Sequence, residues 1–255
     1  MGSLLASTSH RRSVPRTVWH RRAPIVIGAL CALLLLGCSI DGEAQSAPSR
    51  QSLTPRLVGP DGFPRGASPV PAPAVTSVIV DVAGPAGTVE PPRCRAPRVS
   101  AEGAAANVGP GSAGGSPGTG SSGDMGSSSG PTAAGGTLTV LIAYAPTGLD
   151  SFDSFLAKCS RFKTQTAGAS SQVLLRKLPA RAAGGKIGTR SYARTVTTGG
   201  QSGSLSYAIT TLVAQYDGVR VYAEDRRQGA NAQRISADLD TLFRRAVAKA
   251  WPNRA

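Results

Sequence analysis

Histidine and aromatic residues are scarce in this chain of 255 residues. Its only histidines are His10 and His20, so the chain beyond residue 20 cannot form a Ser-His-Asp or Cys-His catalytic site or a histidine-ligated zinc site. A phosphate-binding G-x-x-x-x-G-K-[ST] loop is missing too: Gly184–Ile187 (GGKI) lacks its spacing and its final hydroxyl. We expect that stretch to be a turn.

A long apolar run is missing as well. Residues 23–36 carry no charge, but these fourteen residues fall short of the roughly 20 that a transmembrane helix needs. Basic residues precede the run, and it ends in Leu35-Leu36-Gly37-Cys38. This order is typical of an export signal, and its end resembles the lipobox of bacterial lipoproteins.

The lipobox resemblance implies cleavage before Cys38 and acylation of Cys38 with chains such as palmitate. We therefore expect a signal peptide over 1–37, a lipid-anchored tether over 38–55, and a protein held at the extracytoplasmic face of the cell membrane. Acyl chains supply roughly 0.8 kcal/mol of membrane affinity per buried CH₂. An ordinary cleaved signal, with Cys38 there by chance, and a transmembrane segment are the alternatives.

Basic residues outnumber acidic ones, 28 to 14, and removing the signal leaves a net charge of +9. Such a charge favours anionic partners, here envelope lipids or glycans; the alternative is a solvated surface that serves solubility. We expect no nucleic-acid partner, because the chain is exported and shows no nucleic-acid-binding motif. Arginine outnumbers lysine 23 to 5, a usage that indicates a GC-rich, actinobacterial genome.

Four cysteines sort by position. Cys31 leaves with the signal and Cys38 is the anchor, so Cys94 and Cys159 remain. Two cysteines in an oxidising compartment favour a disulfide. A free reactive thiol at Cys159 is the alternative.

The rest of the chain reads as one domain over 56–255. Within it, residues 109–136 contain 11 glycines in 28 residues and no aromatic side chain, so we expect this stretch to be disordered. It is either a surface insertion or a divider between a weak N-terminal part and a C-terminal domain.

Several runs read as strands. Alternating apolar residues predict a strand buried on both faces over 138–143, and further strands are expected over 173–178 and 189–197. The β-branched run Val75–Val82 also reads as a strand.

The hairpin is the clearest local prediction. Leu205–Tyr216 and Val219–Ala223 flank Asp217-Gly218, a pair that suits a type I′ turn. The turn pairs Tyr216 with Val219, Gln215 with Arg220, Ala214 with Val221, Val213 with Tyr222, and Leu212 with Ala223.

Two helices are expected. One follows a cap at Asp150 or Ser151 and places Cys159 on its core side. The other, capped by Asn231, carries an apolar stripe from Ile235 to Ala250. Together these elements predict an α+β fold, an antiparallel sheet with helices packed on one face.

Carboxylates are the remaining enzymatic option. The candidate pairs are Asp150/Asp153, Asp238/Asp240 and Glu224/Asp225. A capping position for Asp150, opposite faces of a helix for Asp238 and Asp240, and a solvated turn for Glu224 and Asp225 argue against catalysis. Four tyrosines could line a pocket between sheet and helix, or pack in the core: Tyr192, Tyr207, Tyr216 and Tyr222.

The order of features resembles a known family. A lipobox, a tether, the Cys94 segment Glu90-Pro91-Pro92-Arg93-Cys94, a helix bearing Cys159, strands, a hairpin and a closing helix occur in the same sequence. This is similar to actinobacterial lipoproteins related to the extracellular sensor domain of a mycobacterial serine/threonine kinase. The resemblance implies a cleft for an undetermined ligand and no enzymatic activity.

We therefore expect a non-catalytic envelope lipoprotein without a cofactor, which binds a ligand or a partner. A cell-wall enzyme that uses carboxylates or a Ser-Lys pair, and a structural accessory subunit, are the alternatives.

The anchor can be tested by substitution. Cys38→Ser should release the exported protein from the membrane fraction, because the acyl chains attach only to that sulfur. Fractionation with mass spectrometry of the N-terminus checks this, with Cys31→Ser as the control. Recovery of an unmodified Cys38 from membranes would contradict it.

Overall fold

The structure is a computed structural model that describes residues 50–84, 87–111, 136–166, 169–200, 203–229 and 234–254. All of these residues belong to one compact unit, Ala47–Ala255. The predicted signal, Cys38 and the predicted cap Asn231 lie outside the described residues. None of the helices among the described residues combines the length and the apolar character needed to span a bilayer.

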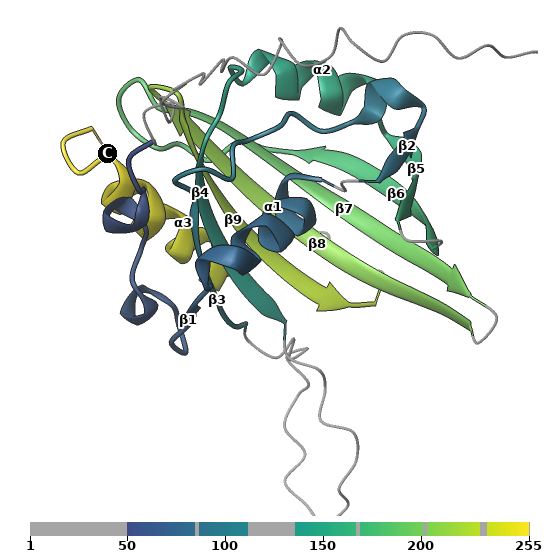
Figure 1. The fold of residues 1–255 in the computed structure, drawn as a ribbon, viewed down its shortest axis with the longest axis horizontal. Helices are drawn as coiled ribbons and strands as arrows, with labels where there is room; N and C mark the ends of the chain where they lie inside the picture. The colour runs from purple at the N-terminus through teal and green to yellow at the C-terminus, as the bar shows by residue number, and fades with distance from the viewer. Residues whose placement is uncertain are drawn as a thin grey trace, which may run out of the picture. The chain divides into compact units, whose positions relative to one another are not determined.

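Nine strands form one antiparallel sheet in the order β1-β3-β4-β9-β8-β7-β6-β5-β2 (Figure 1). The strands are β1 (Ser68–Pro69), β2 (Thr88–Glu90), β3 (Ala105–Pro110), β4 (Thr137–Tyr144), β5 (Arg161–Thr166), β6 (Ala169–Leu178), β7 (Gly188–Gly200), β8 (Gly203–Tyr216) and β9 (Val219–Gln228). The helices are α1 (Val75–Ala83), α2 (Asp150–Lys158) and α3 (Ala237–Ala250). Short 3₁₀ turns cover Thr54–Arg56, Pro60–Gly62, Ala72–Ala74 and Pro92–Cys94. The predicted α+β class with an antiparallel sheet is confirmed.

The helices lie on both faces of the sheet, whereas we expected them on one. Leu138, Leu212 and Val221 pack with α3 in one apolar cluster. Their alternate neighbours, Leu141 and Val213 among them, pack with α1 and α2 in a second cluster. Because side chains alternate along a strand, β4, β8 and β9 supply two separate cores.

The hairpin between β8 and β9 has the predicted register throughout, from Tyr216 opposite Val219 to Leu212 opposite Ala223. Both turn residues have positive φ, 48° at Asp217 and 68° at Gly218, as a type I′ turn requires. β9 continues five residues beyond the predicted end at Ala223, to Gln228.

The prediction of a strand over Val75–Val82 is wrong, because this segment forms α1. Its apolar residues also recur at helical spacing: Val75 and Val82 are buried, while Val78 and Ile79 are partly buried against the same cluster. Packing of that stripe outweighs the strand preference of β-branched residues, which depends strongly on context.

The helix starts also differ from prediction. Leu149 precedes α2 without a side-chain cap, and Asp150 opens its first turn. Ser236 caps α3, where its hydroxyl accepts a hydrogen bond of 3.2 Å from the Leu239 amide and donates one of 2.9 Å to Asp225. The predicted apolar stripe of α3 is buried from Leu239 to Ala250.

The glycine-rich stretch is inserted between paired strands. Its first residues were expected to be disordered but belong to the fold, since β3 reaches Pro110 and the Gly111 amide donates to the Gly136 carbonyl at 2.6 Å. Pro110 lies opposite Thr137, so β3 and β4 pair across the stretch. Residues 112–135 lie outside the described residues. The folded part also starts early, because Leu53, assigned to the tether, is buried.

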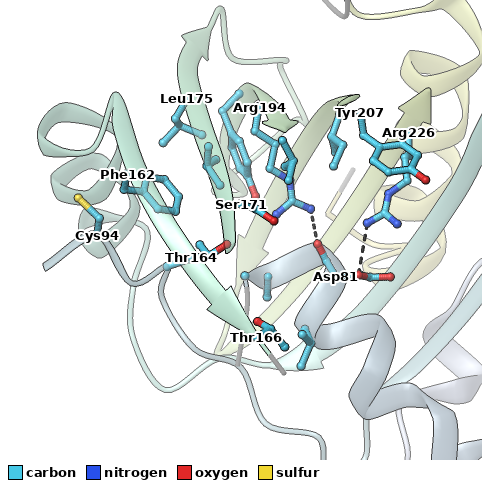
Figure 2. A pocket seen from close by; sticks show the side chains of 18 of the residues that line it. Asp81, Cys94, Phe162, Thr164, Thr166, Ser171, Leu175, Arg194, Tyr207 and Arg226 are labelled. Carbon is cyan, nitrogen blue, oxygen red and sulfur yellow. Dashed lines mark hydrogen bonds and ion pairs between the residues drawn. The ribbon is translucent and has the colours of Figure 1, made fainter. Parts of the chain in front are cut away.

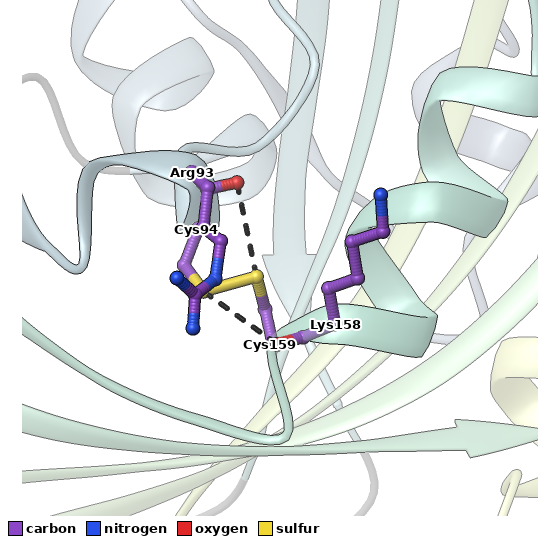
Figure 3. The surroundings of a disulfide bond; sticks show 4 residues. All are labelled: Arg93, Cys94, Lys158 and Cys159. Carbon is purple, nitrogen blue, oxygen red and sulfur yellow. Dashed lines mark hydrogen bonds between the residues drawn. A yellow bond between two sulfur atoms is a disulfide. The ribbon is translucent and has the colours of Figure 1, made fainter.

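The Cys94–Cys159 disulfide is present, as predicted (Figure 3). It joins the turn before β3 to the C-terminal end of α2, across 65 residues of sequence. Both cysteines are buried in the cluster formed with α1 and α2.

Removing the bridge should destabilise the domain. We expect Cys94→Ala/Cys159→Ala to lose about 4 kcal/mol of unfolding free energy, because a loop of this length no longer restricts the unfolded chain. Urea unfolding of the signal-free protein in a Cys38→Ser background measures the loss. A difference below about 1 kcal/mol would contradict the expectation.

Candidate functional site

A cavity of about 320 Å³ lies between α1 and the face of the sheet formed by β5 to β9 (Figure 2). Its floor consists of three rows of cross-strand neighbours. The first row is Leu175, Arg194, Ile209 and Arg226; the second is Phe162, Val173, Val196 and Tyr207; the third is Thr164, Ser171 and Thr198. The rows are two residues apart along each strand, so all three face the same side of the sheet.

The roof is the C-terminal half of α1. Val80, Asp81 and Ala83 face the cavity, and Gly84 ends the helix with a φ of 121°. A side chain at position 84 would be strained at that φ, and its Cβ would lie 2.9 Å from the Cβ of Ala96. Glycine therefore lets the chain leave α1 close to the wall of the cavity. The disulfide residue Cys94 also lines this cavity.

A cluster of four charges joins the floor to the roof. Arg194 contacts Glu224 at 2.8 Å and also donates to the main-chain carbonyl of Asp81. Arg226 lies 3.4 Å from the Asp81 carboxylate and 4.0 Å from Glu224. Figure 2 shows both arginines pointing toward Asp81. The cluster fixes α1 above the sheet through charged contacts.

Glu224 is buried, with 2% of its surface exposed, and the Thr211 hydroxyl donates to it at 3.2 Å. Burial raises the pKa of Glu224, while the nearby Arg194 opposes that rise. Arg194 is therefore the group that makes a negative charge tolerable at this position.

Glu224 and Asp225 were predicted to lie in a solvated turn, and this is wrong. Both are buried in β9. Asp225 faces the other side of the sheet, where it pairs with Arg227 at 2.8 Å and accepts the hydrogen bond from Ser236. The two carboxylates do not share a site. Strand alternation carried past Ala223 was the one sequence signal that could have placed them.

The other carboxylate candidates lie outside the residues that line this cavity. Asp153 on α2 pairs with Arg190 and Lys177, and the hydrogen bond from Arg190 lowers the pKa of Asp153. Asp240 on α3 pairs with Arg181 at 3.0 Å and with Arg244 at 3.3 Å. These contacts fix helices to strands and neighbouring loops.

Two of the four tyrosines, Tyr192 and Tyr207, line the cavity. Tyr222 is buried in the core, and Tyr216 packs edge-on against Trp251 at 6.4 Å. Desolvation raises the pKa of Tyr192 and of Tyr222, so both phenols stay neutral at physiological pH. Of the two roles expected for the tyrosines, lining a pocket thus applies to Tyr192 and Tyr207, and packing applies to Tyr216 and Tyr222.

A surface depression near the disulfide is basic. Arg93, Arg95, Arg98 and Lys158 are exposed along it, and none of the described residues that line it is acidic. We call these four residues the basic patch. The net positive charge is evident from the composition, but its concentration beside the disulfide becomes visible only in the structure.

The described residues form neither a metal-binding cluster nor a phosphate-binding P-loop. No group of three His, Cys, Asp or Glu side chains within them is placed to hold a metal ion. Gly184–Ile187 contains a turn in which Gly184 and Gly185 have positive φ, as expected for that stretch.

No protein family and no curated protein matches the chain. One similar solved structure is that of an uncharacterized protein from Mycobacterium smegmatis, an ortholog of Rv0999. It is 13% identical, with a TM-score of 0.37, over 73% of this chain and 86% of that chain. A similarity this low carries no argument about fold or function.

The buried pair yields a prediction about stability. Arg194→Met should cost about 3–5 kcal/mol, because it leaves Glu224 buried without its cation. The pKa of Glu224 in the folded variant then lies further above its unfolded value, so stability is retained at low pH and is lost as pH rises through the folded pKa. Denaturant unfolding at pH 4.5 and pH 8 measures both effects.

A double variant provides the control. Arg194→Met/Glu224→Leu should recover most of the loss, since no charge remains buried. A double variant as unstable as Arg194→Met would show that the loss comes from packing alone.

Proposed function

We propose that this chain is a membrane-anchored extracytoplasmic lipoprotein whose α+β domain binds a small, largely apolar ligand without catalysing a reaction. Three features support the proposal: the leader that ends at Cys38, the disulfide, and the cavity under α1. A structural disulfide is typical of proteins that fold outside the cytoplasm.

The cavity is the observation that carries the binding function. Ligand sites in proteins usually enclose about 300–1,000 Å³, with apolar walls and a few polar groups. A volume of about 320 Å³ lies at the lower end of this range, so the cavity suits one short chain or one ring system. Its middle row is apolar, and charged and hydroxyl groups lie in the rows on either side.

The lining favours binding over catalysis. Of the described residues that line the cavity, Asp81 is the only carboxylate, and two arginines hold its carbonyl and its side chain. Burial raises the pKa of Glu224, but this carboxylate pairs with Arg194 and is not one of the lining residues. The pair of accessible carboxylates that acid–base catalysis often requires is therefore not presented to a ligand.

Anionic envelope lipids or glycans are the partners we propose for the surface. The basic patch supports this, because each cation near an anionic membrane adds about 1 kcal/mol of attraction. Its depression includes Pro146 and Thr147, just after β4.

The resemblance to the sensor-domain lipoproteins stays a prediction. It implies a cleft for an undetermined ligand, and the cavity under α1 is the place where we propose that such a ligand binds. Nothing in that resemblance requires an enzymatic activity.

The binding function can be tested with a neutral probe, N-phenyl-1-naphthylamine, whose fluorescence rises in apolar surroundings. The signal-free protein should bind it in a saturable manner. Val196→Trp fills the middle row and should weaken binding at least about tenfold, since volume is lost from the cavity.

Thr195→Trp is the matched control. Thr195 is the neighbour of Val196 on β7 and faces the opposite side of the sheet, so this variant should bind as the wild type does. Absence of saturable binding by the wild type, or equal losses in both variants, would overturn the proposal.

A further inference from the structure

Arg226 is the cavity-lining cation with the weakest partners. Charge-assisted contacts from arginine to carboxylate are typically 2.7–2.9 Å long. Arg226 lies 3.4 Å from Asp81 and 4.0 Å from Glu224, both outside this range. It also stacks over Tyr207, 5.7 Å from the centre of the ring. A guanidinium has five N–H donors, so most of its capacity is unused by these contacts.

The two ion pairs of the cluster differ in how tightly they are held. Glu224 is close to Arg194, and only 3% and 10% of their side chains are exposed, so they form a self-contained pair. Asp81 is the counter-ion left for Arg226, and 60% of its side chain is exposed. An exposed and loosely held ion pair contributes little to stability, so another anion can replace Asp81 at low cost.

Two hydroxyl groups of the cavity already have a hydrogen-bond partner within the protein. Ser171 and Thr198 hydrogen-bond to each other at 2.7 Å. In contrast, the Nε atom of Arg194 is buried and has no hydrogen-bond partner among the described residues. The unused donors therefore gather in the arginine row, beside the apolar row of Val173, Val196 and Tyr207.

We infer that the ligand is an amphiphilic anion. Its apolar part lies along the middle row, and its carboxylate or phosphate binds Arg226 in place of Asp81. This inference rests on the proposed function, because it specifies the ligand of the same cavity. Arg226 and the apolar middle row are neighbours on the floor of the cavity, so one short molecule can contact both.

Competition against N-phenyl-1-naphthylamine tests the charge. Decanoate and decyl phosphate should displace the probe at least about tenfold better than decan-1-ol, and decyltrimethylammonium should be the weakest competitor. The two anions also distinguish a fatty carboxylate from a phosphate headgroup, because the better competitor identifies the group that fits Arg226.

Two substitutions should act in opposite directions. Arg226→Gln should weaken decanoate binding about tenfold and leave decan-1-ol unchanged. Asp81→Asn should strengthen decanoate binding a few-fold, since it removes the competing negative charge. Arg244→Gln is the control for net charge. Arg244 lies on α3 with 67% of its side chain exposed, so its substitution should leave the affinities for decanoate and decan-1-ol unchanged.

The outcomes separate this inference from the proposed function. Equal binding of decanoate and decan-1-ol, or a preference for the cationic amphiphile, contradicts the inference that the ligand is an anion. The cavity would then still be a site for an apolar ligand. Failure of every decyl compound and of the neutral probe overturns the ligand site itself. Asp81→Asn keeps the test decisive if Arg226→Gln does not fold, because an unchanged decanoate affinity in Asp81→Asn also contradicts the inference.

Discussion

The structure depends on three central strands that are buried on both faces. β4, β8 and β9 alternate between a core shared with α3 and a core shared with α1 and α2. A shift of one residue in their pairing would exchange the two sets of side chains between the faces. The Asp217-Gly218 turn fixes that register, so the positions of Ile209, Glu224 and Arg226 relative to the cavity follow from it.

The roof of the cavity meets the sheet through charged contacts as well as apolar ones, since Val82 and Ala83 of α1 belong to the same buried cluster as Val173 and Val213. Arg194 on β7 and Arg226 on β9 extend from the sheet to α1. These long side chains connect α1 to the floor, while Glu224 balances the charge of Arg194. The same groups thus join α1 to the sheet and place two arginines in the lining of the cavity. A binding site for an amphiphile is the function this arrangement supports.

Local elements were predictable wherever short-range chemistry decides the structure. Positive φ at Asp217 and Gly218 requires residues of that type, so the turn and its register follow from two neighbouring positions. The alternation over 138–143 and the helical spacing before Ala250 likewise reflect burial on a strand and on a helix. Prediction failed where two patterns coexist. Val75–Ala83 has both β-branched residues and helical spacing, and only contact with the core shared with α2 makes it a helix.

By itself, the sequence determined the hairpin, the buried strand β4, the closing helix and the class of fold, since each follows from the order of residues along a short segment. Tertiary structure decided that helices lie on both faces, that Glu224 is buried, and that two arginines from different strands meet Asp81 from a helix more than 100 residues earlier. Such meetings depend on the pairing of distant strands, and residue periodicity carries no record of which strands are neighbours.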